Sequence, residues 1–154
     1  MTKSIIITHS YHHRNTQKIA AAIAAIMDAT LVEIKEDLTL NLDEYELFGF
    51  GAGIDGGKHY PEMLAYVTTF PSVQNKKAFI FSTSATFSEK RMPGEHKALR
   101  DLLQAKGFVI VGEFGCKGFT TRSIFNWVGG ANKGHPNVDD LINAERFAER
   151  IKLD

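Results

Sequence analysis

The sequence predicts an α/β protein in which helices cover both faces of a doubly wound, five-stranded parallel sheet. Short β-rich runs alternate with longer segments of helical periodicity along the chain, which is the pattern of such sheets. The length of 154 residues suits one domain, so we expect residues 1–154 to form a single unit. Apolar residues make up 44% and charged residues 23% of the chain, which argues against disorder and coiled coil.

The hydrophobic pattern defines the first strand and the first helix. Residues 4–8 are β-branched and nearly all apolar, as expected for a strand that is buried on both faces. Apolar residues then recur at helical spacing over 16–27, which predicts an amphipathic helix with Asn15 as its N-cap. Residues 31–34 predict a second, short strand.

Glycine and proline mark the middle of the chain. Residues 47–51 predict a third strand, which ends in a Gly-rich loop through Gly57. Pro61 suits the first position of a helix over 61–69. Residues 78–81 predict the fourth strand.

The last third of the chain repeats the alternation. A polar loop at 82–94 leads into a helix over 95–106, which Gly107 ends. A fifth strand opens at 108–111, and a last helix opens at Asn137 with two aspartates in its first turn. The apolar residues that this last helix buries are Leu141, Ala144, Ala148 and Ile151.

Charge and cysteine content exclude several classes of protein. Lys plus Arg and Asp plus Glu each total 18, so the chain lacks the basic surface of a nucleic-acid-binding protein. No apolar run reaches the roughly 18 residues of a membrane helix, and no signal-peptide pattern opens the chain. The single cysteine, Cys116, excludes an internal disulfide and fits a reducing compartment. We therefore expect a cytoplasmic protein with no nucleic-acid or membrane partner.

Three loops are the candidate binding segments, because ligands bind at the carboxyl ends of strands where the strand order reverses. They are residues 10–15, 51–59 and 82–94. The first leads into a helix N-terminus, whose free N–H groups suit a phosphate. Its side chains offer hydroxyl, amide and charge-assisted contacts. The candidate phosphate-binding residues are Ser10, His12, His13, Arg14, Asn15 and Thr16. A capped helix start with solvated histidines is an equally good interpretation of the pattern alone.

The other two loops suit a flat ligand. Small residues let the backbone approach such a ligand closely, and one aromatic side chain, Phe87, is placed to stack on it. The candidate residues are Ala52, Gly53, Ile54, Thr83, Ser84, Ala85 and Phe87. The structural alternative is a flexible turn followed by a polar surface loop.

The sequence lacks the motifs that are typical of several other kinds of chemistry. No Walker or dinucleotide glycine motif follows the first strand, and no Gly-x-Ser-x-Gly nucleophile motif is present. The neighbouring histidines have no further ligand at metal spacing, so we predict no metal site. Cys116 is expected to be buried by the fifth strand as a small core residue. A response-regulator receiver would need acidic residues where His9-Ser10 and Gly51-Ala52 stand.

As a set, the length, the five strand–helix units and the three loops resemble the flavodoxin family. In that family the first loop holds the FMN phosphate with a Ser/Thr-rich run that ends Gly-Asn-Thr. Here Ser10, Asn15 and Thr16 match in kind, and Arg14 replaces the glycine. The resemblance implies the strand order 2-1-3-4-5, FMN as the cofactor, and an isoalloxazine ring held by the second and third loops. Ile54 and Phe87 would flank the ring.

Two functions remain open under this resemblance. The first is a flavodoxin-like electron carrier, most simply a monomer, that passes electrons between a reductase and an acceptor enzyme. The alternative is a small FMN-dependent NAD(P)H:quinone-type oxidoreductase of the same fold. Residues 117–136 form a connection that is long enough to suggest a function, with Trp127 among its aromatics. The pattern leaves open whether it covers the flavin or packs on a helix.

Overall fold

The computed structural model describes residues 3–10, 14–35, 39–118 and 134–153. Its strands are β1 (Ser4–His9), β2 (Thr30–Glu33), β3 (Leu47–Asp55), β4 (Lys58–His59), β5 (Lys76–Ser84) and β6 (Phe108–Lys117). Its helices are α1 (Asn15–Met27), the short 3-10 turn η2 (Leu42–Glu44), α2 (Pro61–Thr69), α3 (Met92–Glu95), α4 (Lys97–Ala105) and α5 (Val138–Leu153).

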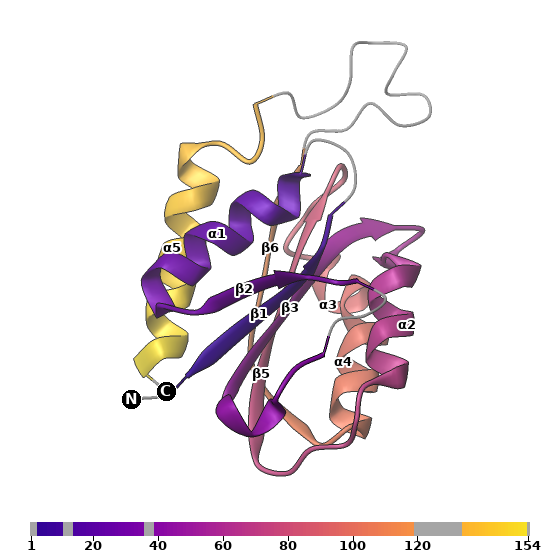
Figure 1. The fold of residues 1–154 in the computed structure, drawn as a ribbon. Helices are drawn as coiled ribbons and strands as arrows, with labels where there is room; N and C mark the ends of the chain where they lie inside the picture. The colour runs from indigo at the N-terminus through magenta and orange to yellow at the C-terminus, as the bar shows by residue number, and fades with distance from the viewer. Residues whose placement is uncertain (1–2, 11–13, 36–38, 119–133, 154) are drawn as a thin grey trace.

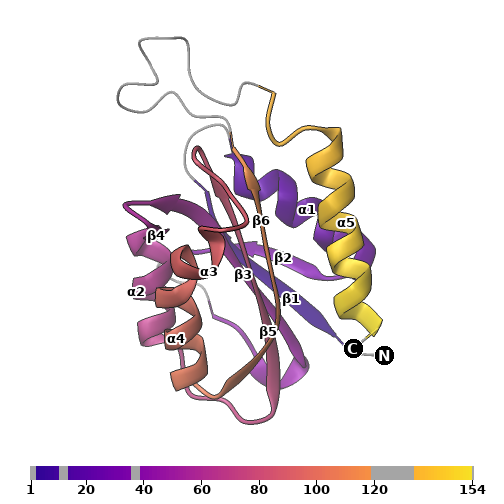
Figure 2. The same ribbon diagram turned by 180° about the vertical axis from the view of Figure 1, so that it is seen from behind.

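Five parallel strands form the sheet, in the order β2-β1-β3-β5-β6. The two-residue β4 pairs antiparallel with the end of β3 and lies off this path. Helices α1 and α5 cover one face of the sheet, and α2, α3 and α4 cover the other (Figures 1 and 2). The predicted α/β fold and its strand order are confirmed when β4 is left out of the numbering.

The central strand β1 contributes to two apolar cores. Ile5 and Ile7 face α2 and α4, and Ile6 faces α1 and α5, all three without solvent exposure. This alternation is what an almost wholly apolar strand achieves when helices cover both faces of a sheet. Each core is filled by aromatic rings from the neighbouring strands, Phe48 and Phe50 on the first side and Phe79 and Phe81 on the second.

Strands β3 and β5 run further than the sequence pattern indicates. They stay paired up to Gly53 and Thr83, and β3 ends at Asp55. The prediction of a Gly-rich loop here is therefore wrong. Strand β3 continues to Asp55, and a tight turn leads from it into β4. Gly56 and Gly57 form this turn with φ of 63° and 81°, values that favour glycine.

The glycines inside β3 serve packing. A Cβ on Gly49 would lie 2.3 Å from Phe79, and one on Gly51 would lie 2.2 Å from Phe81. The rings of β5 therefore fill the space beside these glycines. The expectation that Gly51 opens a loop for close approach to a ligand is corrected, because an aromatic side chain occupies that space.

Helix boundaries differ from the predictions in two places. The predicted helix over 95–106 is α4, which starts at Lys97, and the separate short helix α3 ends before it at Glu95. The N-cap of α1 is Arg14, and the predicted cap Asn15 is the first helical residue. The start of α5 is as predicted: Asp140 donates its N–H to the Asn137 side chain at 2.9 Å, a capping arrangement. None of the helices in the described ranges is long and apolar enough to cross a membrane.

Candidate functional site

The start of α1 and the ends of β5 and β6 meet at the carboxyl edge of the sheet. The hydroxyl oxygens of Thr16 and Thr83 lie 3.0 Å apart in a buried hydrogen bond. Gly118, just beyond β6, donates its backbone N–H to the carbonyl of Ser84 at 3.1 Å. A Cβ on Gly118 would lie 2.8 Å from the Asn15 amide nitrogen, so glycine permits this approach. The structure thus brings the first and third predicted segments together.

The N-terminus of α1 is suited to an anion. Its 13-residue helix carries no acidic residue in the first turn, so no like charge opposes a phosphate there. Arg14 precedes the helix with φ of 52°, in the left-handed region that favours glycine. The backbone at position 14 thus keeps the conformation for which glycine is the natural residue, although the side chain is arginine.

The Arg14 side chain points toward β2. Its Nη2 donates a hydrogen bond of 2.8 Å to the Glu33 carboxylate, and its side chain is 63% exposed. An exposed ion pair of this kind contributes little stability, so it holds the guanidinium loosely. Ser10 is half-buried directly after β1. The predicted His12 and His13 lie outside the described residues.

The second predicted segment belongs to the end of β3. Ala52 and Gly53 are buried and Ile54 is half-buried. A Cβ on Gly53 would lie 2.6 Å from the ring of Tyr60, so the Tyr60 ring covers the end of this strand. Sequence reasoning missed Tyr60; the available signal was an aromatic directly before the helix-opening Pro61.

The third predicted segment divides between strand and turn. Thr83 and Ser84 are buried at the end of β5, and Ala85 is half-buried beyond it. The Phe87 ring packs over Gly115 of β6, where a Cβ would lie 2.7 Å from it. Stacking of Phe87 on a ligand therefore stays a prediction.

A buried polar cluster lies below this edge, on the α4 side of β5. Ser82 Oγ lies 2.7 Å from His96 Nε2, and His96 Nδ1 lies 2.9 Å from the Glu113 carboxylate. Arg100 holds the same carboxylate through two hydrogen bonds of 2.7 and 2.8 Å. His59 lies beside the cluster, with its ring centroid 4.9 Å from that of His96. The sequence pattern contained no signal for this cluster, because its members are far apart along the chain.

The protonation states of this cluster follow from its contacts. Burial opposes the charge of Glu113, but hydrogen bonds from His96 and Arg100 outweigh it and lower its pKa to about 2. Complete burial, together with the neighbouring His96, lowers the pKa of His59 to about 3. Glu113 is therefore ionised and accepts from His96 Nδ1–H, whereas His59 is neutral at pH 7.

The order of Ser82, His96 and Glu113 matches that of a hydrolase triad, but the site does not suit a nucleophile. Ser82 is 2% exposed and lies within a strand paired on both sides. A substrate carbonyl has no access to its hydroxyl. The cluster is consequently a candidate for supporting the edge above it.

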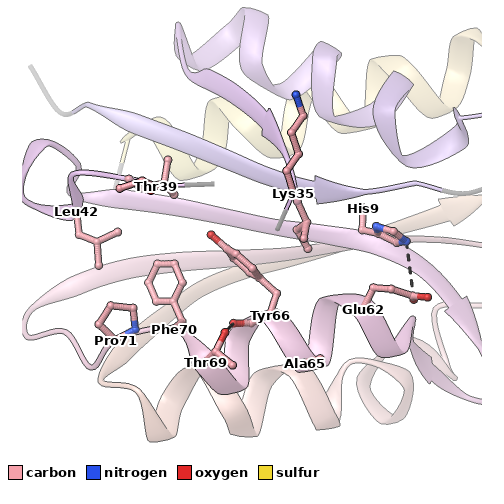
Figure 3. A pocket seen from close by; sticks show the side chains of 12 residues that line it. His9, Lys35, Thr39, Leu42, Glu62, Ala65, Tyr66, Thr69, Phe70 and Pro71 are labelled. Atoms are coloured by element: carbon pink, nitrogen blue, oxygen red, sulfur yellow. Dashed lines mark hydrogen bonds and ion pairs between the residues drawn. The ribbon is translucent and has the colours of Figure 1, made fainter. Parts of the chain in front are cut away.

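A partly apolar hollow of about 800 Å³ lies between α2 and the segment after β2. Figure 3 shows the rings of Tyr66 and Phe70 along it and His9 facing Glu62 at one end, with Nε2 and Oε2 3.8 Å apart. Sequence reasoning missed this hollow too. It lies on the α2 face, beside the edge where the three predicted segments were expected.

Cys116 lies in the core, as the sequence predicted. Cys116 is 4% exposed, and burial raises the pKa of its thiol, so it is a core residue and a poor nucleophile. Among the described residues, no group of three or more His, Cys, Asp or Glu side chains could hold a metal ion.

Sequence comparison decides the family. A family model described as a flavodoxin domain matches residues 6–129. The chain belongs to the flavodoxin family. A protein of Methanocaldococcus jannaschii whose function is uncharacterised is 46% identical over 149 residues, which cover 97% of each chain.

Solved structures of flavodoxin-like proteins share the fold at low identity. An oxidised flavodoxin of Bacillus cereus is 17% identical, covers 97% of both chains and has a TM-score of 0.69. An NADH:FMN oxidoreductase is 14% identical and has a TM-score of 0.65. The match covers 99% of this chain and 89% of that protein's chain. At these identities the likeness concerns the fold alone.

As a member of the flavodoxin family, the protein binds FMN, and the described residues fit this cofactor. The acid-free N-terminus of α1, with Asn15 and Thr16, would hold the phosphate. The ends of β3 and β5, which are paired side by side up to Gly53 and Thr83, would hold the ring. When bound, FMN supplies one- and two-electron redox chemistry. The protein binds and orients the cofactor and provides the charges around it.

Proposed function

We propose that this flavodoxin-family protein is an electron carrier that shuttles electrons between a reductase and an acceptor enzyme. The observation that carries the proposal is the exposure of both turns that border the flavin site. Residues 55–58, from the end of β3 to the start of β4, are exposed, as are Thr86 and residues 89–91 after β5. A carrier needs a flavin whose edge partner proteins can reach, and exposed turns on both sides provide that access.

The balanced net charge of the chain supports weak, local contacts with partner proteins. The formal net charge is +0, with 18 basic and 18 acidic residues. A neutral carrier has no single-sign surface for strong steering, so we propose that it meets its partners as a monomer through local contacts. As part of the same proposal, the protein works in the cytoplasm, where its one cysteine stays reduced.

The alternative is a small FMN-dependent NAD(P)H:quinone-type oxidoreductase. The fold it shares with an NADH:FMN oxidoreductase favours this alternative, as does the hollow of about 800 Å³ beside the carboxyl edge. An oxidoreductase needs a place for a second substrate. A carrier does not.

Anaerobic reduction separates the two functions. The FMN-loaded protein is mixed with NADH or NADPH, with and without a separate flavodoxin reductase, and the flavin absorbance is followed. We expect bleaching with the reductase and none without it. Rapid oxidation of NAD(P)H by the protein alone, with transfer to a quinone, would establish the alternative. Absence of flavin binding after reconstitution would overturn both.

A further inference from the structure

The hollow on the α2 face has one wall made by α2 and the residue that caps its C-terminus. Glu62, Tyr66 and Phe70 are spaced four residues apart, so they lie on one side of successive helical turns. The rings of Tyr66 and Phe70 meet edge to face, with their centroids 5.7 Å apart. The Thr69 hydroxyl donates to the Tyr66 carbonyl at 3.0 Å, so this polar group is used within the helix. The wall is therefore mainly aromatic.

The second wall of the hollow is aliphatic. Ile34, Leu40 and Leu42 line it, and all three pack against the core on the α2 and α4 side of the sheet. Ile34 directly follows β2, and its backbone N–H donates to the Thr8 carbonyl at 2.9 Å, which ties this wall to β1. Figure 3 shows the ammonium group of Lys35 directed away from the rings. An aromatic wall and an aliphatic wall around one hollow suit a flat apolar molecule.

A polar pair lies at one end of the hollow. His9 Nε2 and Glu62 Oε2 are 3.8 Å apart, and Figure 3 shows both groups at this end. A carboxylate only accepts hydrogen bonds, so it faces the N–H of the imidazole. The His9 ring meets the Tyr60 ring edge to face, with centroids 6.2 Å apart. The gap between His9 and Glu62 is too long for a direct hydrogen bond, but it suits one oxygen atom that accepts from His9 and donates to Glu62.

The size and the surroundings of the hollow favour a small molecule over a protein segment. Its volume of about 800 Å³ lies within the range of roughly 300–1,000 Å³ that small-molecule sites occupy. Among the described residues, the exposed large apolar side chains are Val109, Val138 and Ile142, which lie on β6 and α5. None of these three borders the hollow. A protein partner would need an apolar surface that continues beyond the hollow, because stable interfaces bury about 1,200–2,000 Å².

We propose that the hollow binds a small, flat aromatic molecule that carries one uncharged hydroxyl group. The aromatic body packs between the rings of Tyr66 and Phe70 and the aliphatic wall. The hydroxyl oxygen accepts a hydrogen bond from His9 Nε2 and donates one to the Glu62 carboxylate. An anionic head group is disfavoured because its charge would lie beside that of Glu62. The inference goes beyond the proposed function, since it involves no electron transfer and holds for either candidate function.

The first test locates the site by methyl NMR of the FMN-loaded protein, with naphthol as the probe. We expect naphthol to shift the methyl signals of Ile34, Leu40 and Leu42 and to leave those of Val109 and Val138 unchanged. The apoprotein should give the same shifts, so a failure of flavin binding would count against the proposed function and not against this site. Unchanged methyl signals at the hollow would overturn the inference, also where naphthol changes the flavin absorbance by stacking on the cofactor.

The second test measures the hydroxyl contact by calorimetric titration with naphthol and with its methyl ether, which cannot donate a hydrogen bond. In wild type we expect naphthol to bind about ten- to a hundredfold more tightly, the usual effect of one hydrogen bond to a charged group. In Glu62→Ala this preference should disappear, while the methyl ether binds as it does to wild type. Glu145→Ala is the matched control, because Glu145 is exposed on α5 and does not line the hollow. It should keep the wild-type preference.

Three outcomes of this titration would contradict the inference. Equal affinities of wild type for naphthol and its methyl ether would show that the hydroxyl makes no specific contact. An equal loss of affinity for both ligands in Glu62→Ala would show that the glutamate supports the shape of the hollow and does not accept from the hydroxyl. Tighter binding of the anionic naphthoate than of naphthol would show that the site selects a negative charge.

Discussion

At the scale of single residues, the contact of Arg14 with the phosphate stays a prediction. The sequence suggested a direct charge-assisted contact, and the structure shows its guanidinium on Glu33. Arg14→Gly removes the guanidinium while easing the left-handed backbone. We expect FMN affinity to fall about ten- to a hundredfold and riboflavin affinity to stay unchanged, because only FMN carries the phosphate. Titration of the apoprotein with both flavins measures this.

Glu33→Gln is the control for the Arg14 experiment, since it releases the guanidinium from its partner and leaves the arginine in place. We expect FMN binding as tight as in wild type or tighter. Equal loss of FMN and riboflavin affinity in Arg14→Gly would show that the arginine supports the fold of the loop and does not contact the phosphate.

His59 makes stability depend on pH. Its pKa falls to about 3 through burial and the neighbouring His96, against 6.5 in the unfolded chain. The unfolded state therefore binds more protons between these values, and stability drops as pH falls from about 6.5 toward 3. This residue adds a slope of up to about 1.4 kcal/mol per pH unit to the free energy of unfolding. Urea unfolding of His59→Gln should show a flatter pH dependence than that of wild type.

At the scale of elements, the glycines of β3 determine how closely its neighbour packs. A Cβ at Gly51 would lie 2.2 Å from the Phe81 ring, which is completely buried. We expect Gly51→Ala to lower the free energy of unfolding by about 1–3 kcal/mol. Chemical denaturation compares it with Gly94→Ala in α3, where no atom lies within 4 Å of the added Cβ. The two variants should differ clearly in their free energy of unfolding. Equal values would mean that β3 and β5 can shift to accommodate the added methyl group.

At the scale of the whole molecule, we expect the charge near the flavin site to influence the redox potential. The chain is neutral overall; the exposed Lys58 opens β4, directly after the Gly56–Gly57 turn, and the exposed Lys90 lies in the turn after β5. Positive charge nearby stabilises the anionic reduced flavin. We therefore expect a less negative potential for the second one-electron step than in a strongly acidic flavodoxin. Lys58→Ala with Lys90→Ala should lower this potential by about 20–60 mV at low ionic strength, less as salt screens the charges.

Lys106→Ala with Lys152→Ala is the control for that experiment. It changes the net charge equally, but both lysines lie at the C-terminal ends of helices, α4 and α5, away from the site. Spectroelectrochemistry of the three proteins should shift the potential in the first double variant only. The same shift in both would mean that overall charge, and not its position, sets the potential.

Much of the architecture could be predicted from the sequence because it rests on local patterns. The apolar run at 4–8 required a strand covered on both faces, and the spacing over 16–27 required a helix with one buried face. Pro61 and Asn137 marked helix starts that the structure confirms. The strand order followed from the family resemblance, since periodicity alone does not say which strands are neighbours.

Only the tertiary structure decided where strands end and which polar groups meet. β3 continues through its glycines because β1 and β5 pair with it on both sides and aromatic rings fill the space that glycine leaves. Tyr60 covers the end of β3 only because the β4 turn folds back upon that strand. Ser82 of β5, His96 between α3 and α4, and Glu113 of β6 form one hydrogen-bonded chain. No local pattern encodes such contacts, because their hydrogen bonds join residues that only the folded sheet brings within 3 Å.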